Sequence, residues 1–284
     1  MWKKIFFSLA VVILVIIILF VGLGDRMFHK QVSKEIETLF ANSEDFSDNV
    51  FTYDQINELP EPVQRYFKYS LKEGPPYISY ARLKHNGTFR TKEDQKWMPI
   101  SGEEYFTTQR PGFVWYATVK PFPLIWIAAR DRYFNGHGNM LIKIFSTFTI
   151  ADAKGSEMDY SSLIRFLSEA PWYPSALLPS DYLQWEEIDS ESARAVISDG
   201  DITASAIFYF DGKGEITRLE CVRYQSVDDS YSKETWIGYY SQYKEIDKVR
   251  IPHEVEVVWR LKTGDFSYAR FLVTEIEFNN PSGY

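Results

Sequence analysis

His137 has the surroundings best suited to acid–base chemistry, because glycines flank it in the run Asn135-Gly136-His137-Gly138. Glycine permits the positive φ of a tight turn, which would expose the imidazole beside a pocket. Asp152 and Glu169 are carboxylates near a predicted helix, and either could assist the imidazole in a hydrolase-like reaction. A plain turn between strands explains the same run more simply. The sequence therefore favours a non-enzymatic protein and leaves His137, Asp152 and Glu169 as an alternative catalytic set.

Other reactive motifs are missing from the sequence. It contains no Gly-x-Ser-x-Gly elbow, phosphate-binding loop, Gly-x-Gly-x-x-Gly run or Cys-x-x-Cys pair. His253-Glu254 begins like a zinc protease motif, but Val257 stands at the position of the second histidine. The single cysteine, Cys221, excludes an intrachain disulfide and any multi-cysteine metal site. We predict no metal and no cofactor.

Aromatic residues are unusually frequent, at 17% of the chain. Core packing accounts for most of them, but aromatic side chains also line cavities for apolar ligands. Trp115, Trp126, Trp172 and Tyr173 gather around a predicted hairpin and the loop after a predicted helix. We expect these four residues to line a hydrophobic groove that binds a lipid or another apolar ligand.

The body of the chain reads mainly as antiparallel strands. Apolar and polar residues alternate in Ala81–Arg90, which is typical of a strand with one buried face, and His85 falls on that face as a core histidine. Phe113–Val119 and Leu124–Ala129 flank a short turn and predict a hairpin. Further strands are expected at Ile202–Phe210, Ile216–Val227, Thr235–Tyr243, Pro252–Leu261 and Phe266–Phe278. Glycine-containing turns between the later strands favour a long meander.

Two helices are expected to pack on this sheet. One begins near Pro62 and ends before Gly74. The other begins at Ser156, where Asp159 would complete a capping box, and ends at Pro171. The apolar connection that follows, residues 172–178, must be buried against another part of the protein.

The first part of the chain predicts a membrane anchor. Residues 5–24 carry no charge, and about 20 apolar residues in a helix match the thickness of a bilayer core. A cleaved signal peptide would have a shorter apolar run and a small-x-small cleavage site, so we favour an uncleaved anchor. Residues 1–4 form a cytoplasmic tail on this interpretation, with the body outside the cytoplasm. The charge bias that orients the span is weak, because Lys3 and Lys4 compete with Arg26, Lys30 and Lys34.

Residues 25–50 are interpreted as a juxtamembrane helix and a linker, and residues 51–284 as one β-rich ectodomain. Met27, Val32, Ile36, Leu39 and Phe40 recur at helical spacing in a charged background. This amphipathic helix would lie on the bilayer surface or pack on the ectodomain.

Charge restricts the partners. The chain has 31 basic and 39 acidic residues, giving a net charge of -8, so no basic surface for phosphate is implied and nucleic acid is excluded as a partner. The predicted partners are the lipid bilayer, through residues 5–24, and an apolar ligand.

Several runs resemble a bacterial family of membrane-anchored proteins whose domain has no assigned function. They are Leu59-Pro60-Glu61-Pro62-Val63-Gln64-Arg65-Tyr66, Asn135-Gly136-His137-Gly138, residues 169–178, and Arg250-Ile251-Pro252 followed by Val258-Trp259. The resemblance covers most of the body and implies a bacterial, single-pass, extracytoplasmic protein without supplying a catalytic residue. The predicted sheet with a helix crossing between strand blocks is also similar to the half-barrel of bacterial lipoprotein carriers, by architecture alone.

Together these patterns predict a mainly β (α+β) protein: an N-terminal transmembrane helix, then one curved antiparallel sheet or half-barrel with one or two packed helices. The preferred function is a single-pass, membrane-tethered protein of the cell envelope that holds an apolar ligand or lipid. The alternatives are a hydrolase-like enzyme built on His137 and a structural module that binds other proteins.

Overall fold

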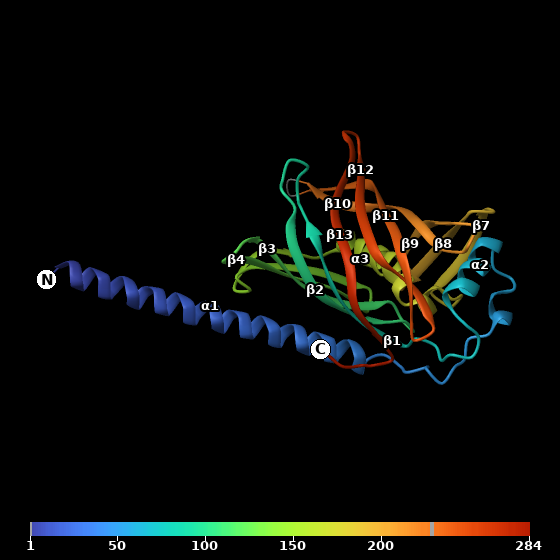
Figure 1. The fold of residues 1–284 in the computed structure, drawn as a ribbon, viewed down its shortest axis with the longest axis horizontal. Coiled ribbons are helices and arrows are strands. Elements are labelled where there is room, and N and C mark those ends of the chain that lie inside the picture. The colour runs from blue at the N-terminus through green and yellow to red at the C-terminus, as the bar shows by residue number, and fades with distance from the viewer. Residues whose placement is uncertain (1, 228–229) are drawn as a thin grey trace.

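The computed structural model describes residues 2–227 and 230–284, so residue 1 of the predicted tail and residues 228–229 of the predicted ectodomain lie outside it. The described chain forms one curled antiparallel sheet of 13 strands, with a long first helix and two shorter α-helices (Figure 1). The strands are β1 Tyr80–Phe89, β2 Met98–Thr107, β3 Gly112–Phe122, β4 Ile125–Phe134, β5 His137–Ile144, β6 Phe148–Ala153, β7 Leu183–Asp189, β8 Ser192–Asp199, β9 Ile202–Phe210, β10 Ile216–Val227, β11 Ser230–Ile246, β12 Val249–Leu261 and β13 Gly264–Phe278. The helices are α1 Trp2–Ala41, α2 Glu61–Ser70 and α3 Ser156–Glu169. Short 3-10 turns lie at Tyr53–Ile56, Ala170–Trp172 and Pro174–Leu177. The predicted mainly β half-barrel is confirmed.

Two meanders make up the sheet. Strands β1 to β6 follow one another outward from one side of a central seam, and β13 back to β7 follow one another from the other side. The seam is the antiparallel pair of β1 and β13, in which Ala81 lies opposite Phe278. The two edges of the sheet are therefore β6 and β7, and α3 connects them through the inside of the curl.

The inner face of the sheet holds the main core. Helix α3 packs there against both meanders, with Leu163, Ile164 and Leu167 fully buried. The apolar connection at residues 172–178 is buried in the same core, as its sequence predicted. Helix α2 packs beside β8, β9 and β12.

The outer face of β1 to β5 carries the second half of α1. The apolar side chains of α1 that pack there are Phe28, Val32, Ile36, Leu39 and Phe40. The predicted short juxtamembrane helix is therefore the continuation of one unbroken helix of 40 residues, and it lies on the body. Met27, predicted on the buried face, is 65% exposed, and Phe28 takes its place.

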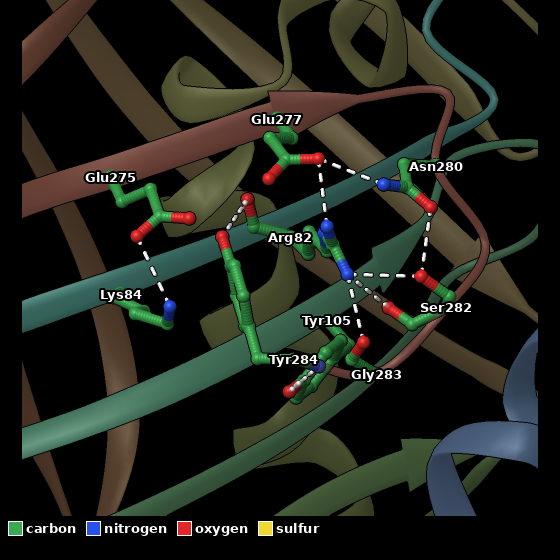
Figure 2. Close-up of polar contacts among 9 residues, drawn as sticks. All are labelled: Arg82, Lys84, Tyr105, Glu275, Glu277, Asn280, Ser282, Gly283 and Tyr284. Atoms are coloured by element: carbon green, nitrogen blue, oxygen red, sulfur yellow. Dashed lines mark hydrogen bonds and ion pairs between the residues drawn. The ribbon is translucent and has the colours of Figure 1, made fainter.

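The segment after β13, residues 279–284, also lies on the outer face (Figure 2). The Arg82 guanidinium donates to the carbonyl oxygens of Ser282 and Gly283 and pairs with Glu277 at 2.8 Å. The ring of Tyr284 stacks beneath the Arg82 guanidinium and the Lys84 ammonium, at 4.3 and 3.7 Å from its centroid. This segment covers the polar side of β1 at the seam.

Several elements differ from the sequence-based expectation. The predicted hairpin is confirmed as β3 and β4, whereas β2, β5, β6, β7 and β8 were not predicted. Strand β2 carries Pro99, Gly102 and two adjacent glutamates. These residue types are rare in strands, so the sequence of this segment does not predict one. The predicted capping box is wrong, because Gly155 is the N-cap of α3 and the Asp159 carboxylate accepts from the backbone N–H of Gly138 instead.

Candidate ligand-binding cavity

A cavity of about 140 Å³ lies inside the curl, between the second half of α3 and the strands on both sides of the seam. Its wall is largely apolar, with Trp115 from β3, Trp236 from β11 and Phe271 from β13. Trp172, just after α3, closes one side, and its indole N–H donates to the Pro252 carbonyl at 3.0 Å. The cavity is thus walled by rigid aromatic side chains from distant parts of the chain.

A buried charge cluster forms the polar part of this wall. The Arg165 guanidinium on α3 binds Glu104 of β2 at 2.8 Å, Asp131 of β4 at 2.8 Å and Glu169 of α3 at 2.9 Å. Asp131 and Glu104 are 0% and 1% exposed. The guanidinium also lies 4.7 Å from the ring centroid of Trp115, so the cluster and the aromatic wall touch.

Three carboxylates around one guanidinium leave a surplus of negative charge. Burial raises the pKa of Glu104 well above its usual range, and the neighbouring Glu169 and Asp131 carboxylates raise it further. Burial also raises the pKa of Glu169. We assign a proton to Glu104, whose carboxyl group then donates to Glu169, which is physically the cheapest way to bury both groups side by side.

Two buried carboxylate oxygens of the cluster, Asp131 Oδ1 and Glu169 Oε2, have no hydrogen-bond partner among the described residues, and the second is the one to which a protonated Glu104 can donate. Asp131 is among the residues that line the cavity. An unpartnered buried oxygen costs about 1–3 kcal/mol, so a ligand hydroxyl, amine or water that donates to it would be stabilising. The cavity therefore combines an apolar wall with a cluster of carboxylates that contains an unpartnered acceptor.

His85 holds the indole of Trp115 in place through a hydrogen bond. Its imidazole does not titrate in the physiological range. The Trp115 indole N–H donates to His85 Nε2 at 2.8 Å, and burial together with the positive charge of Arg165 lowers the pKa of His85 to about 3. A Cβ on Gly102 would lie 2.7 Å from His85 Nε2, so the glycine leaves room for the ring. The inward placement of His85 as a core histidine is confirmed.

The four predicted ligand-binding aromatics do not form one group. Trp115 and Trp172 both line the cavity. Tyr173 lies deeper in the core, where its ring centroid is 4.2 Å from that of Phe106 and its hydroxyl donates to the Phe166 carbonyl. Trp126 lies on the outer face next to α1, and its indole N–H donates to Ser146. The structure brings two of the four together and places Trp126 on the opposite side of the sheet.

The alternative catalytic residues are also apart. His137 is exposed at the start of β5 and lies 3.6 Å from Asp159, at the first turn of α3. Asp152 lies on the outer face, bound to Asn139 and Lys154. Glu169 lies at the other end of α3, inside the cavity cluster. No shared site for the three exists within residues 2–227 and 230–284.

Sequence reasoning missed Glu104, Asp131 and Arg165. One signal was present, since Arg165 and Glu169 are four residues apart in a helix, the spacing of an ion pair. Glu104 and Asp131 gave no signal, because a carboxylate in a strand is expected to face water. In the part of the chain that the structure describes, no group of three or more histidine, cysteine, aspartate or glutamate residues is arranged to hold a metal ion. Arg165 occupies the space between the three carboxylates.

A family model identifies most of the chain. Residues 49–271 match the family of unknown function DUF6544. This protein belongs to DUF6544. The matched region begins after α1 and contains β1 to β12 and the first part of β13, so it includes the whole cavity and its charge cluster. No curated protein matches the chain.

Two solved structures are similar in outline to this DUF6544 member. One is a LolA superfamily protein from Nitrosomonas europaea, with 9% identity and a TM-score of 0.41 over 77% of this chain and 92% of the other. The second is a beta-barrel-like protein of the domain of unknown function DUF1849 from Brucella abortus, with 9% identity and a TM-score of 0.30 over 72% of this chain and 99% of the other.

Proposed function

We propose that this protein is a single-pass, membrane-anchored binding protein that holds an apolar group in the cavity between Trp115 and Trp172. The observation that carries the proposal is the pairing of an aromatic wall with an unpartnered acceptor, Asp131 Oδ1, on residues that line the same cavity. Ligand sites commonly have this composition, a mostly apolar surface with a few placed polar groups.

The size of the cavity limits what it holds as it stands. A cavity of about 150 Å³ accepts a benzene-sized molecule. The 140 Å³ here therefore fits one ring or a short stretch of an alkyl chain. The ligand class we propose is an apolar molecule or lipid segment with a hydrogen-bond donor next to its apolar part, with the donor facing Asp131.

Helix α1 supplies the anchor in this proposal. It is long and apolar enough to cross a membrane, and its 40 residues correspond to about 60 Å, twice the thickness of a bilayer core. The second half of the same helix is packed on the body, so cleavage after residue 24 would cut an unbroken helix. These two features support an uncleaved anchor. The orientation, with residues 1–4 in the cytoplasm and the ectodomain outside, is part of the proposal.

The test uses the full chain, extracted from its host membrane into polymer nanodiscs and analysed by native mass spectrometry with solvent extraction. We expect a co-purifying apolar molecule at one per chain. Ala269→Leu should remove it, because Ala269 lines the cavity and is 1% exposed, so a larger side chain fills the space. Trp126→Ala is the matched control, since it deletes an aromatic ring on the outer face.

Circular dichroism and the melting temperature show whether each variant is folded. Retention of the same molecule by a folded Ala269→Leu protein, or its loss in Trp126→Ala alone, would place the ligand outside the cavity. Wild-type protein that carries no stoichiometric molecule would contradict the proposed function.

A further inference from the structure

Helix α1 touches the sheet again at the end of its apolar run. The Thr147 hydroxyl, in the turn between β5 and β6, donates to the Val21 carbonyl at 3.3 Å. The rings of Phe20 and Phe148 lie 5.9 Å apart. Gly24 permits this approach, because a Cβ there would collide with the Thr147 side chain. The β5–β6 turn therefore lies beside the last turns of the predicted membrane span.

The β3–β4 turn lies at the same end of the sheet. Its neighbour Trp126 accepts from the Phe145 backbone N–H at 3.0 Å through its carbonyl, and the two rings are in edge contact at 5.0 Å. Figure 1 shows the ends of β3 and β4 beside the projecting part of α1. The two turns form one rim, which we call the helix-side rim, comprising residues 122–124 and 145–150.

The helix-side rim is the most apolar exposed part of the body. Outside α1, the four most exposed large hydrophobic side chains among the described residues all belong to it: Leu124 at 85%, Phe122 at 64%, Ile150 at 59% and Phe148 at 50%. Scattered exposed apolar residues are normal, but a cluster marks a contact with another apolar phase. The cluster sits where the membrane span ends.

Depth and charge agree with a lipid contact. Phe20, the neighbour of Phe148, lies four residues before the end of the apolar run at Gly24, which is about 6 Å along the helix. Side chains that bind at a membrane interface are buried by about 5–10 Å. Lys120, exposed two residues before Phe122 on β3, would lie at the level of anionic headgroups.

We infer that the helix-side rim is a second membrane contact, with Phe122, Leu124, Phe148 and Ile150 inserted into the interfacial layer of the bilayer that α1 crosses. The inference depends on the anchoring role proposed for α1. It adds that the body does not swing freely at the end of its anchor: two attachments, the span and the rim, fix the orientation of the half-barrel on the membrane.

The test measures immersion depth in the full chain, reconstituted into vesicles of phosphatidylethanolamine and phosphatidylglycerol. A nitroxide label is attached at Leu124→Cys, and its collision rates with oxygen and with a water-soluble nickel chelate are compared by electron paramagnetic resonance. Ile188→Cys, on β7 and 43% exposed, is the control far from α1, and Val15→Cys reports on the middle of the span. Cys221 need not be replaced, because it is buried and burial raises the pKa of its thiol to about 12.

We expect the oxygen-to-nickel ratio at Leu124→Cys to exceed that at Ile188→Cys several-fold, and Ile150→Cys to give the same result independently. Equal ratios at Leu124→Cys and Ile188→Cys, with Val15→Cys still in lipid, would overturn the rim contact and leave the anchor intact. A water-exposed Val15→Cys would overturn the anchor itself, and the rim contact with it.

Discussion

The two faces of strand β4 hold buried charges in opposite proportions. Arg130 points outward, where Glu35 of α1 lies between it and Arg132 at 2.9 and 3.8 Å. Asp131, the next residue, points inward and shares Arg165 with two glutamates. The outer cluster thus has one carboxylate between two cations, whereas the inner cluster has one cation among three carboxylates.

The outer cluster is a structural contact that holds α1 on the sheet, whereas the inner cluster belongs to a candidate binding site. On the outer face, Arg130 also donates to the carbonyl and side-chain oxygens of Asn139 at 2.7 and 2.6 Å, and its charge is paired with Glu35, although Arg130 Nε and Glu35 Oε2 form no hydrogen bond. The inner cluster has surplus carboxylate charge, burial raises the pKa of Glu104, and the buried Asp131 Oδ1 has no hydrogen-bond partner although Asp131 lines a cavity. A buried surplus of like charge beside a cavity, with a perturbed pKa, is more typical of a functional site than of a structural contact.

Arg165→Met should have the largest effect on stability. The substitution leaves Glu104, Asp131 and Glu169 buried without a cation, and breaking a buried ion pair typically costs about 3–5 kcal/mol, a large part of the stability of a typical domain. We expect a loss of at least about 3 kcal/mol in the free energy of unfolding, measured by urea titration of the full chain in nanodiscs. Arg132→Met on the outer face, where Arg132 is 42% exposed, should change it by less than about 1 kcal/mol. Equal losses in both variants would contradict the contrast.

Glu35→Gln should have a smaller effect, confined to the docking of α1. Arg130 keeps its two bonds to Asn139, so the loss should be about 1–3 kcal/mol. Hydrogen exchange of residues 28–40 should speed up while the inner core stays protected. Glu37→Gln, exposed on the same helix, serves as the control. Faster exchange around Arg165 in Glu35→Gln would show that the two clusters are one unit.

The smallest effect is a change in the pH dependence of stability. The raised pKa of Glu104 means that the folded protein keeps a proton which the unfolded chain releases above about pH 4.5. The stabilisation that this proton gives to the folded state is therefore complete at low pH. It is lost as the pH rises through the folded pKa of Glu104, by up to about 1.4 kcal/mol per pH unit. We expect the free energy of unfolding to decrease less above pH 4.5 in Glu104→Gln than in the wild type.

Two other groups serve as controls for the direction of this pH dependence. His85 has a lowered pKa, so it removes stability as the pH falls from 6.5 toward about 3, in the wild type and the Gln variant alike. Asp152, on the outer face, has its pKa lowered by Lys154 and Asn139, so Asp152→Asn should remove stability that is lost only in acid. A Glu104→Gln protein with an unchanged pH profile above 4.5 would show that Glu104 is ionised.

Alternation along single strands was readable from the sequence, and the relation between strands was not. The period-2 pattern placed His85 inside correctly. Trp115 and Trp126 lie on neighbouring strands, and the register that sets Trp115 opposite Asp131 puts Trp126 on the other face, with Ala128 and Arg130. That register depends on an irregularity between Val119 and Phe122.

The charge cluster was hidden for a related reason. Glu104 and Asp131 occupy positions where alternation calls for apolar side chains, and only Arg165, from a helix between the two meanders, makes them tolerable there. A pattern confined to one strand cannot report a partner so distant. The apolar connection after α3 was the exception, since an apolar loop has to be buried whatever its partner is.

The seam between β1 and β13 also sets the order in which the molecule can form. Each meander is made of neighbours in the chain and can assemble as it is synthesised, but Ala81 must wait for Phe278, roughly 200 residues later, before the halves join. Until then β1 and β12 are open edges, the part of a nascent sheet most prone to aggregate. The cavity takes walls from both meanders, so it exists only in a finished chain: a partly made protein emerging from the ribosome has no place for a ligand.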